Sequence, residues 1–528
     1  MKVYTKILIV ELILGAILRF LNLLYFHGLD TDEAIYAQAV SALTKGYAPY
    51  RDVFFAHPPV YLYLEYGVLS VNHSLLALRS FNAVLGLATT FLIYEACKLA
   101  YSERAALIAS GIYALYPLAI YSNKIAFVDN GLTFFTTLMM LLFLKYLKED
   151  KAKFIALSGL FAGVSLMTKY TAVLIVGALA LFFMFTLLRK RPKHFVVFVS
   201  GALVFPAITV LLLLQTNIWP FFYEQTIHWQ NIRFSMPPIE KFWFFVDLLF
   251  SLCPMLIPAM LAIPSNIRER KWQLMMAWAF IPLAALPFSK VVFLQYGFSL
   301  IPPLCILVAR GLERNIPADF SFKRSMQKAL QFKTIKKKII PLSDIILALI
   351  YVLMILVFAT GFSSGARWFL IDSVKGDVTT ATLTQSQINL GSYVKNLTRP
   401  EDKIWTTEAS IAFFAERTIV APNSTFWKFQ GFFQDVWAYS WTRDDYRGPI
   451  PGYRDGLITL NDIQNAWQTE KPKIILFFSS SVVDQFIWNG IQNDYTVQQG
   501  LAGYVTANYH LANIPEFQTV QVWIRNTA

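Results

Sequence analysis

The 528-residue chain is far too apolar for an ordinary soluble protein, because 56% of its residues are hydrophobic and only 15% are charged. The formal net charge of +13 lies mostly in short basic stretches between apolar segments, which is typical of cytoplasmic loops and argues against a nucleic-acid partner. The composition therefore predicts an integral membrane protein surrounded by lipid, in the cell membrane or in an ER-type membrane of a eukaryote.

Apolar runs long enough to cross the bilayer, which takes about 20 residues each, recur through the first two thirds of the chain. Loops with several basic residues, such as residues 145–153 and 189–193, alternate with loops that carry few. The positive-inside rule then predicts a cytoplasmic N-terminus. We expect residues 1–362 to form a polytopic α-helical membrane domain with about 11 transmembrane helices. The runs begin near Ile7, Leu75, Arg104, Gly131, Phe154, Tyr170, Phe195, Phe242, Trp272, Gln295 and Leu342.

The first outer loop, residues 26–74, contains a dense set of polar residues beside the membrane. Within it, residues 28–59 hold Asp30, Asp32, Glu33, Asp52 and His57. An acid placed where a helix meets the bilayer surface can serve as a general base, a metal ligand or a helix cap. A helix cap explains one Asp before a helical run but not the whole set. We therefore predict a functional site in this loop.

Other charged residues are predicted to lie at the same outer level of the membrane. Asp129 is at the outer end of the fourth span, either as a helix cap or as a further acid of the site. Lys169 occupies a tight outer turn, and Arg79 lies near the outer end of the second span; each can also simply anchor the interface. His57 and Lys290 are further cations. Acids that deprotonate a hydroxyl and cations that neutralise a phosphate are the two halves of a transfer from a lipid phosphate.

The composition changes near Ser363, after which charged and polar residues return. Two strand-like runs, residues 403–406 and 473–478, have turn residues nearby. We expect residues 363–528 to form a soluble α/β domain, which the charge pattern places on the extracytoplasmic side.

Short motifs follow one another in a fixed order along the membrane portion. They are Asp32-Glu33 with Tyr36, Gly46, Pro49-Tyr50 and Asp52, the Pro58-Pro59 pair, Arg79 with Asn82, Asp129, Thr168-Lys169, and Tyr296 followed by Pro302-Pro303. In this order they resemble the GT-C superfamily of polyprenyl-phosphate-sugar-dependent glycosyltransferases, and within it the protein O-mannosyltransferase and aminoarabinose-transferase-like group. The resemblance also covers the plan of a helical bundle followed by an outward C-terminal domain.

The resemblance implies an inverting transfer of a sugar, mannose by default, from a dolichyl or undecaprenyl phosphate carrier. The acceptor is a protein, a glycan or a lipid on the outer face of the membrane. By the same resemblance Asp32 is the general base, Glu33 and Asp129 are the other catalytic acids, and Lys169 meets the lipid phosphate.

One motif departs from the family pattern. Aminoarabinose transferases carry an acid two residues before the Pro-Pro pair and a Lys directly before it, and Ala56 and His57 stand at those positions here. His57 is therefore expected to replace the Lys as a phosphate contact, together with Arg79, Lys290 and Tyr296.

No cofactor is certain from the sequence. Asp32, Asp129 and His57 offer oxygen and nitrogen ligands for a divalent metal such as Mg or Mn, and the need for such a metal differs among enzymes of this kind.

An ion-coupled transporter or a lipid flippase is the alternative function. Such proteins usually place ionisable residues near the bilayer midplane and often consist of repeated halves, whereas the acids here lie at predicted outer ends and no halves match. A non-catalytic scaffold is a third class, in which the Asp32-Glu33 pair would be dispensable.

Overall fold

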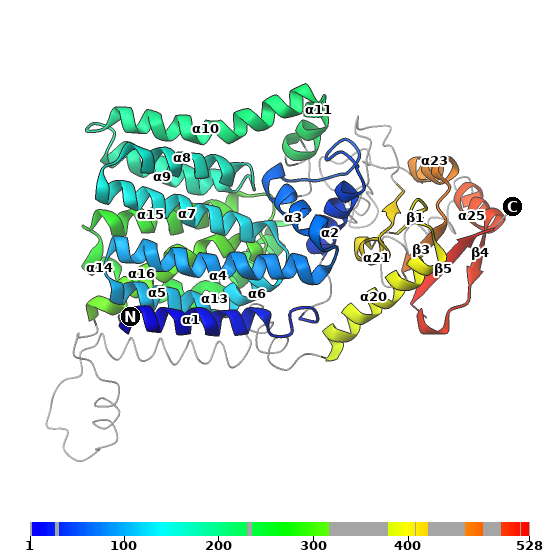
Figure 1. The fold of residues 1–528 in the computed structure, drawn as a ribbon, viewed down its shortest axis with the longest axis horizontal. Coiled ribbons are helices and arrows are strands. Elements are labelled where there is room, and N and C mark those ends of the chain that lie inside the picture. Colours follow the sequence, from blue (N-terminus) through cyan, green and yellow to red (C-terminus); the bar gives the residue numbers. More distant parts are fainter. Residues whose placement is uncertain are drawn as a thin grey trace, which may run out of the picture.

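The computed structural model describes residues 3–26, 31–228, 230, 235–315, 378–406, 408–420, 460–478, 498–517 and 519–526. Long helices run side by side in a bundle, and a smaller unit that contains a sheet lies at one end of it (Figure 1). The predicted span near Leu342, the predicted boundary between residues 362 and 363, and Asp30 all lie outside the described residues.

The ends of several bundle helices follow from the local sequence. Ser74 and Ser102 cap α4 and α5, because each hydroxyl accepts a hydrogen bond from the backbone N–H three residues later. Proline stands in the first turn of α6 and α10, where the missing N–H removes no helical bond. The bundle consists of α1 (Val3–Phe20), α4 (Leu75–Ala100), α5 (Glu103–Leu115), α6 (Pro117–Lys124), α7 (Val128–Glu149), α8 (Ala152–Leu166), α9 (Ala172–Thr186), α10 (Pro192–Gln215), α13 (Pro238–Leu261), α15 (Arg270–Ala285) and α16 (Ile301–Asn315), with shorter helical pieces α11 (Trp219–Phe222), η1 (Tyr223–His228), α14 (Ile263–Asn266), η2 (Leu286–Phe288) and η3 (Leu294–Leu300) between them.

Four of the described helices, α4, α7, α10 and α13, are long and apolar enough to cross a membrane, and the bent pair α5 and α6 makes a fifth. The helices α8 and α9 are apolar but shorter. The chain is therefore an integral membrane protein, while the total of about 11 spans stays a prediction.

The span predicted to begin near Arg104 is broken in the structure. Helices α5 and α6 meet at an angle of 57° before Pro117. The buried Arg19 guanidinium donates hydrogen bonds to the carbonyl oxygens of Tyr113 (3.2 Å) and Ala114 (2.8 Å), and to Asn123 Oδ1 (3.0 Å). These bonds satisfy carbonyl groups that the break leaves without helical partners.

The predicted outer loop 26–74 is more ordered than a loop, because it contains two helices, α2 (Thr31–Thr44) and α3 (Pro59–Val71). Both lie at the end of the bundle that faces the sheet-containing unit (Figure 1). The first turn of α2 contains Asp32 and Glu33. Pro59 is in the first turn of α3, as the Pro58-Pro59 pair predicts.

The C-terminal unit combines a five-stranded sheet with helices α20 (Val378–Leu397), α21 (Ala409–Ala415), α23 (Leu460–Glu470) and α25 (Gln498–Asn508). The strand order is β2-β1-β3-β5-β4, with β1 parallel to β2 and β3, and β5 antiparallel to β3 and β4. The two predicted strands are confirmed as β1 and β3. The strands are β1 (Lys403–Trp405), β2 (Thr418–Ile419), β3 (Ile474–Phe478), β4 (Tyr509–Ala512) and β5 (Val520–Arg525).

Candidate functional site

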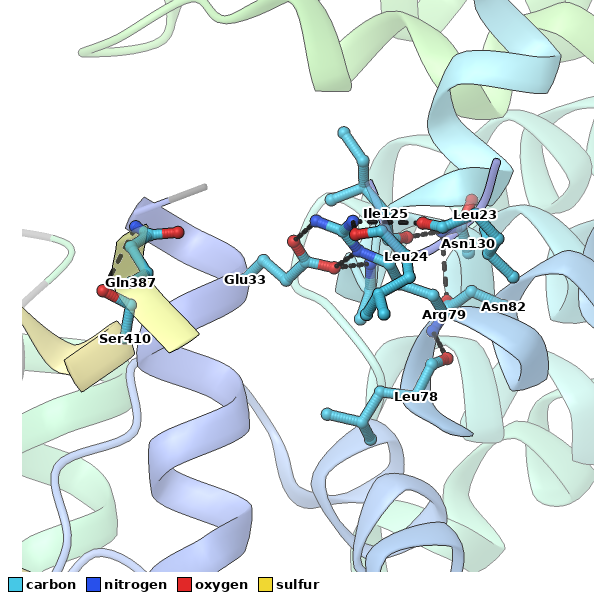
Figure 2. Close-up of polar contacts among 11 residues, drawn as sticks. Leu23, Leu24, Glu33, Leu78, Arg79, Asn82, Ile125, Asn130, Gln387 and Ser410 are labelled. Carbon is cyan, nitrogen blue, oxygen red and sulfur yellow. Dashed lines mark hydrogen bonds and ion pairs between the residues drawn. The ribbon is translucent and has the colours of Figure 1, made fainter. Parts of the chain in front are cut away.

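The two acids at the start of α2 have different surroundings. Glu33 is fully buried, and Arg79 of α4 binds its carboxylate with two hydrogen bonds, Nε to Oε1 at 2.9 Å and Nη2 to Oε2 at 2.6 Å (Figure 2). The backbone N–H of Ala126 adds a third bond at 2.9 Å. Asp32 is partly exposed, and Gln295 Nε2 lies 3.3 Å from its Oδ2. Since consecutive helical residues point about 100° apart, one acid can face the bundle core while the other faces the site.

The Arg79 side chain binds other groups of the protein. Besides Glu33, its Nη1 donates to the carbonyl oxygens of Leu23 (3.1 Å) and Leu24 (3.0 Å), and none of its surface is exposed. In this conformation a lipid phosphate has no access to the Arg79 guanidinium. The geometry therefore gives no support to the predictions that Arg79 contacts the phosphate and that Glu33 reacts; it favours a buried ion pair that fixes α2 on the bundle.

Asp129 and Lys169 form a second buried ion pair. The Lys169 Nζ lies 2.8 Å from Oδ1 and 2.7 Å from Oδ2 of Asp129, which is in the first turn of α7. The same ammonium lies 5.1 Å from the centre of the Tyr296 ring, within cation–π distance. Asp129, Lys169 and Tyr296, three of the residues predicted from the sequence, are thus brought together from three separate segments.

The short helix η3 joins the acid and the cation. Gln295 contacts Asp32, and its neighbour Tyr296 contacts Lys169. Consecutive residues of one helical turn therefore connect the candidate base to the candidate phosphate-binding cation. Gln295 is not recognisable as a site residue from the sequence alone, because a single neutral amide in an apolar run carries no signal.

His57 lies on the wall between α2 and the turn that carries Lys169. Its Nε2 is 2.9 Å from the Tyr36 hydroxyl, and Tyr36 follows Asp32 by one turn of α2. The His57 ring also contacts the rings of Phe55 and Tyr170. His57 therefore contacts a residue near the candidate base and a residue near the candidate cation: Tyr36 follows Asp32 by one helical turn, and Tyr170 is the residue after Lys169.

The segment before His57 is held in place by hydrogen bonds that involve Gln225 of η1 and Tyr50. Gln225 Oε1 accepts a hydrogen bond from the Phe55 N–H (3.0 Å), and Gln225 Nε2 donates to the Tyr50 carbonyl oxygen. The Tyr50 hydroxyl donates to the His57 carbonyl oxygen at 3.0 Å, and burial raises the pKa of this phenol. These hydrogen bonds therefore fix the backbone that leads to His57.

Asp52, another acid of the predicted cluster, has a local structural role. It accepts hydrogen bonds from the Arg51 side chain and from the Ala48 N–H at 2.8 Å. The hydrogen bond from Arg51 is the main cause that lowers the pKa of Asp52. Asp52 thus stabilises the turn that leads to His57.

Lys290 is half-buried, and its backbone carbonyl oxygen accepts a hydrogen bond from the Met236 N–H at 3.0 Å. Its predicted contact with a phosphate stays a prediction.

The predicted metal ligands do not assemble. Within the part of the chain that the structure describes, no group of three or more His, Cys, Asp or Glu side chains is arranged to hold a metal ion. Both carboxylate oxygens of Asp129 bind the Lys169 ammonium instead. The set of Asp32, Asp129 and His57 therefore does not fit a metal centre in this conformation, because a lysine occupies the place next to Asp129 that the cation would take.

Comparison with known proteins gives one family match. Residues 56–213 match the model of a family described as dolichyl-phosphate-mannose-protein mannosyltransferase. This region includes His57, Arg79, Asp129 and Lys169 but not Asp32. An uncharacterized protein of Aquifex aeolicus is 26% identical over 348 residues, which span 62% of this chain and 66% of that protein, just under two thirds of its length.

Solved structures share the fold over nearly the whole chain. ArnT from Cupriavidus metallidurans, at 16% identity, aligns over 98% of this chain and 97% of its own, with a TM-score of 0.65 in the apo state and 0.64 when bound to undecaprenyl phosphate. The oligosaccharyltransferase AglB from Archaeoglobus fulgidus, in complex with an inhibitory peptide and a dolichol-phosphate, has a TM-score of 0.51 at 10% identity over 99% of this chain and 74% of its own.

Proposed function

We propose that the chain is a glycosyltransferase of the GT-C superfamily, which moves a sugar from a polyprenyl phosphate carrier to a hydroxyl acceptor at the outer face of the membrane. The observation that carries this proposal is the link through η3, where Gln295 contacts the Asp32 carboxylate and Tyr296 contacts the Lys169 ammonium. Transfer from a phosphate ester to a hydroxyl requires an acid that accepts the hydroxyl proton and a cation that stabilises the phosphate. Two consecutive residues of η3 contact one of each.

Asp32 is the general base in this proposal. Its carboxylate accepts the proton of the acceptor hydroxyl while the hydroxyl oxygen attacks the anomeric carbon of the sugar. The bond between that carbon and the phosphate oxygen breaks, and polyprenyl phosphate leaves with one additional negative charge. Because attack comes from the side opposite the phosphate, the anomeric configuration inverts.

Lys169 stabilises the charge that develops on the leaving phosphate. Asp129 and the Tyr296 ring fix the position of its ammonium before the donor arrives, so little reorganisation is needed during the reaction. His57, held by Tyr36, is proposed as a second phosphate contact from the opposite wall.

The relatives support the choice of donor. ArnT was solved with undecaprenyl phosphate and AglB with a dolichol-phosphate, and the family match names dolichyl-phosphate-mannose. We take mannose as the sugar on that description. The basic loops support a cytoplasmic N-terminus under the positive-inside rule, and hence a site and a C-terminal unit on the outer side.

Nothing in the part of the chain that the structure describes favours the transporter alternative. The fold aligns with that of ArnT over 98% of the chain, and the acids of both ion pairs lie in the first turns of α2 and α7 rather than in the middle of the long helices.

A transfer assay tests the proposal. The purified protein in nanodiscs is given radiolabelled polyprenyl-phosphate mannose and a mixture of peptide, glycan and lipid acceptors, with and without EDTA. We expect label to reach an acceptor, and the Asp32→Asn variant to transfer it about 100-fold or more slowly, since a general base contributes at least that factor.

The fold of the variant is checked by thermal unfolding in the same nanodiscs. Wild-type rates in Asp32→Asn contradict the assignment of the base. No transfer and no hydrolysis of any lipid-linked sugar by folded wild-type protein contradicts the proposed function itself. The EDTA arm reads out metal dependence separately.

A further inference from the structure

The helix that carries Asp32 is enclosed on all sides. Every residue of α2 from 33 to 43 is buried, whereas a helix on a protein surface buries only one stripe. Many of these residues are small, which allows neighbours to approach closely. Helix α3 packs against α2 from the bundle side, and α21 of the C-terminal unit packs against it from the other side (Figure 1).

A buried hydrogen bond joins α2 to the C-terminal unit. Gln38, which is 1% exposed, donates from Nε2 to the carbonyl oxygen of Arg417 at 2.9 Å. Gln38 follows Asp32 by six residues, which is about 9 Å along the helix axis. Displacement of α2 at Gln38 therefore moves Asp32 as part of the same rigid rod.

The acceptor of this bond is held firmly. The buried Arg417 guanidinium donates to the Lys395 and Thr398 carbonyl oxygens at the C-terminal end of α20 (3.2 and 2.7 Å), and to the Ala415 and Glu416 carbonyl oxygens at the C-terminal end of α21 (both 3.1 Å). A cation at two helix C-termini satisfies their unpaired carbonyl groups and complements both helix dipoles. The Arg417 carbonyl oxygen is thus presented by a fixed joint of two helices.

Two further contacts support the same docking. Lys45, just after α2, donates from Nζ to the Glu416 carbonyl oxygen at 2.8 Å. His73 is hydrogen-bonded to Ser41 of α2 at 2.9 Å, and its ring is stacked on Phe413 of α21 with centres 5.3 Å apart. The docking therefore involves the middle and the end of α2, while Asp32 at its start stays partly exposed.

We propose that the C-terminal unit positions Asp32 for the transfer reaction by holding α2, with Gln38 and Arg417 as the positioning residues. Two anchors just after Asp32 in the chain hold α2: Glu33 and Arg79 tie the helix to the bundle, and Gln38 ties it to the C-terminal unit. Figure 2 shows the first anchor, with Gln387 and Ser410 of the C-terminal unit on the other side of α2. The kinetic part of this inference rests on the proposed function, whereas the structural part does not.

The variant Gln38→Met tests it in the full-length protein. Methionine keeps the volume of Gln38 and cannot donate to Arg417. It also removes Gln38 Oε1, to which no donor is directed among the described residues, so the overall stability should change little. We expect the amides of residues 31–44 to exchange hydrogen faster than in wild type, and kcat to fall between about 10- and 100-fold, because small displacements of a reacting group cost that much. KM for the donor should stay the same, since Lys169 and Tyr296 are untouched.

Two further variants complete the test. Thr90→Val removes a buried hydroxyl that donates to the Gly86 carbonyl oxygen within α4, away from the interface with the C-terminal unit, and should change neither exchange in α2 nor kcat. Lys45→Met removes an exposed contact of the same interface and should act in the same direction as Gln38→Met but more weakly, which keeps the test valid if Gln38→Met fails to fold.

The outcomes separate the two claims. Wild-type exchange over residues 31–44 in both interface variants overturns the docking role. Faster exchange with wild-type kcat overturns the role in catalysis. If wild-type protein transfers no sugar, the proposed function fails, and the exchange measurement still decides whether the C-terminal unit holds α2.

Discussion

Glu33 is next to Asp32 in the chain, yet its carboxylate has a structural role in the core. Two hydrogen bonds from Arg79 and one from the Ala126 N–H neutralise it in the core. Breaking a buried ion pair by removing one partner leaves an uncompensated charge, which costs more than the pair itself contributes.

We predict that Glu33→Gln destabilises the protein by about 3–5 kcal/mol, because the Arg79 charge stays buried without its partner. Thermal unfolding in detergent measures this loss. The double variant Glu33→Gln, Arg79→Met should recover part of it, since no buried charge remains. A Glu33→Gln protein that is fully stable but inactive would show that Glu33 takes part in the reaction, as first predicted from the sequence.

At this scale the sequence identified the residue types of the site but not their partners. Topology alone placed Asp129 and Lys169 at the same membrane level, and a pairing across 40 residues depends on how α7 and α8 pack. Arg79 was expected at the lipid phosphate because a cation near the membrane surface fits that role, and its burial against Glu33 has no signature in the sequence. Gln295 was missed because a single neutral amide in an apolar run carries no recognisable signal.

The helices of the bundle depend on close approach at a few glycines. A Cβ on Gly86 of α4 would lie 2.1 Å from Asn123 Oδ1. Asn123 has no freedom to move away, because Arg19 donates to its Oδ1 at 3.0 Å and its Nδ2 donates to Asn130 at 2.9 Å. The broken helix α5–α6 thus fits against α4 only because position 86 lacks a side chain.

We predict that Gly86→Ala destabilises the protein by about 1–3 kcal/mol through overpacking. Gly177→Ala in α9 is the matched control, because a Cβ there meets nothing within 4 Å, and it should be neutral or slightly stabilising. Unfolding temperatures of the two variants in the same detergent make the comparison. Equal stability of both alanine variants would contradict the described packing of α6 on α4.

The sequence predicted the bundle helices well, since a membrane demands long apolar runs and little else produces them. The starts predicted near Leu75, Arg104 and Phe154 lie within two residues of observed helix starts. An Asp cap before a helical run was considered only as an alternative, and the burial of α2 was not predicted, because the helix is rich in small and polar residues and has no apolar stripe. Its burial comes from the next helix, α3, and from α21 far along the chain, and periodicity reveals neither contact.

The whole molecule consists of a membrane bundle and a C-terminal unit that meet across α2. The change of composition near Ser363 and the apolar runs at β1 and β3 indicated the second unit. Its mixed sheet, with β5 between β3 and β4, was beyond prediction because strand order depends on long-range pairing. The docking of α21 on α2 is what makes the two units one functional assembly in our account.

The central claim is that Asp32 acts on the acceptor while Lys169 acts on the donor phosphate. The most direct measurement determines, for the same nanodisc preparations, binding of polyprenyl phosphate and the rate of a single round of sugar transfer. We predict that Asp32→Asn binds the lipid phosphate like wild type and transfers sugar about 100-fold or more slowly.

In the same measurement the double variant Asp129→Asn, Lys169→Met, which removes the ammonium without leaving its partner carboxylate charged and buried, should lose affinity for the lipid phosphate by about tenfold or more. We therefore expect Asp32→Asn to keep its affinity for the lipid phosphate and lose transfer, and the double variant to lose affinity. Unchanged transfer by Asp32→Asn, or wild-type affinity in the double variant, would contradict it.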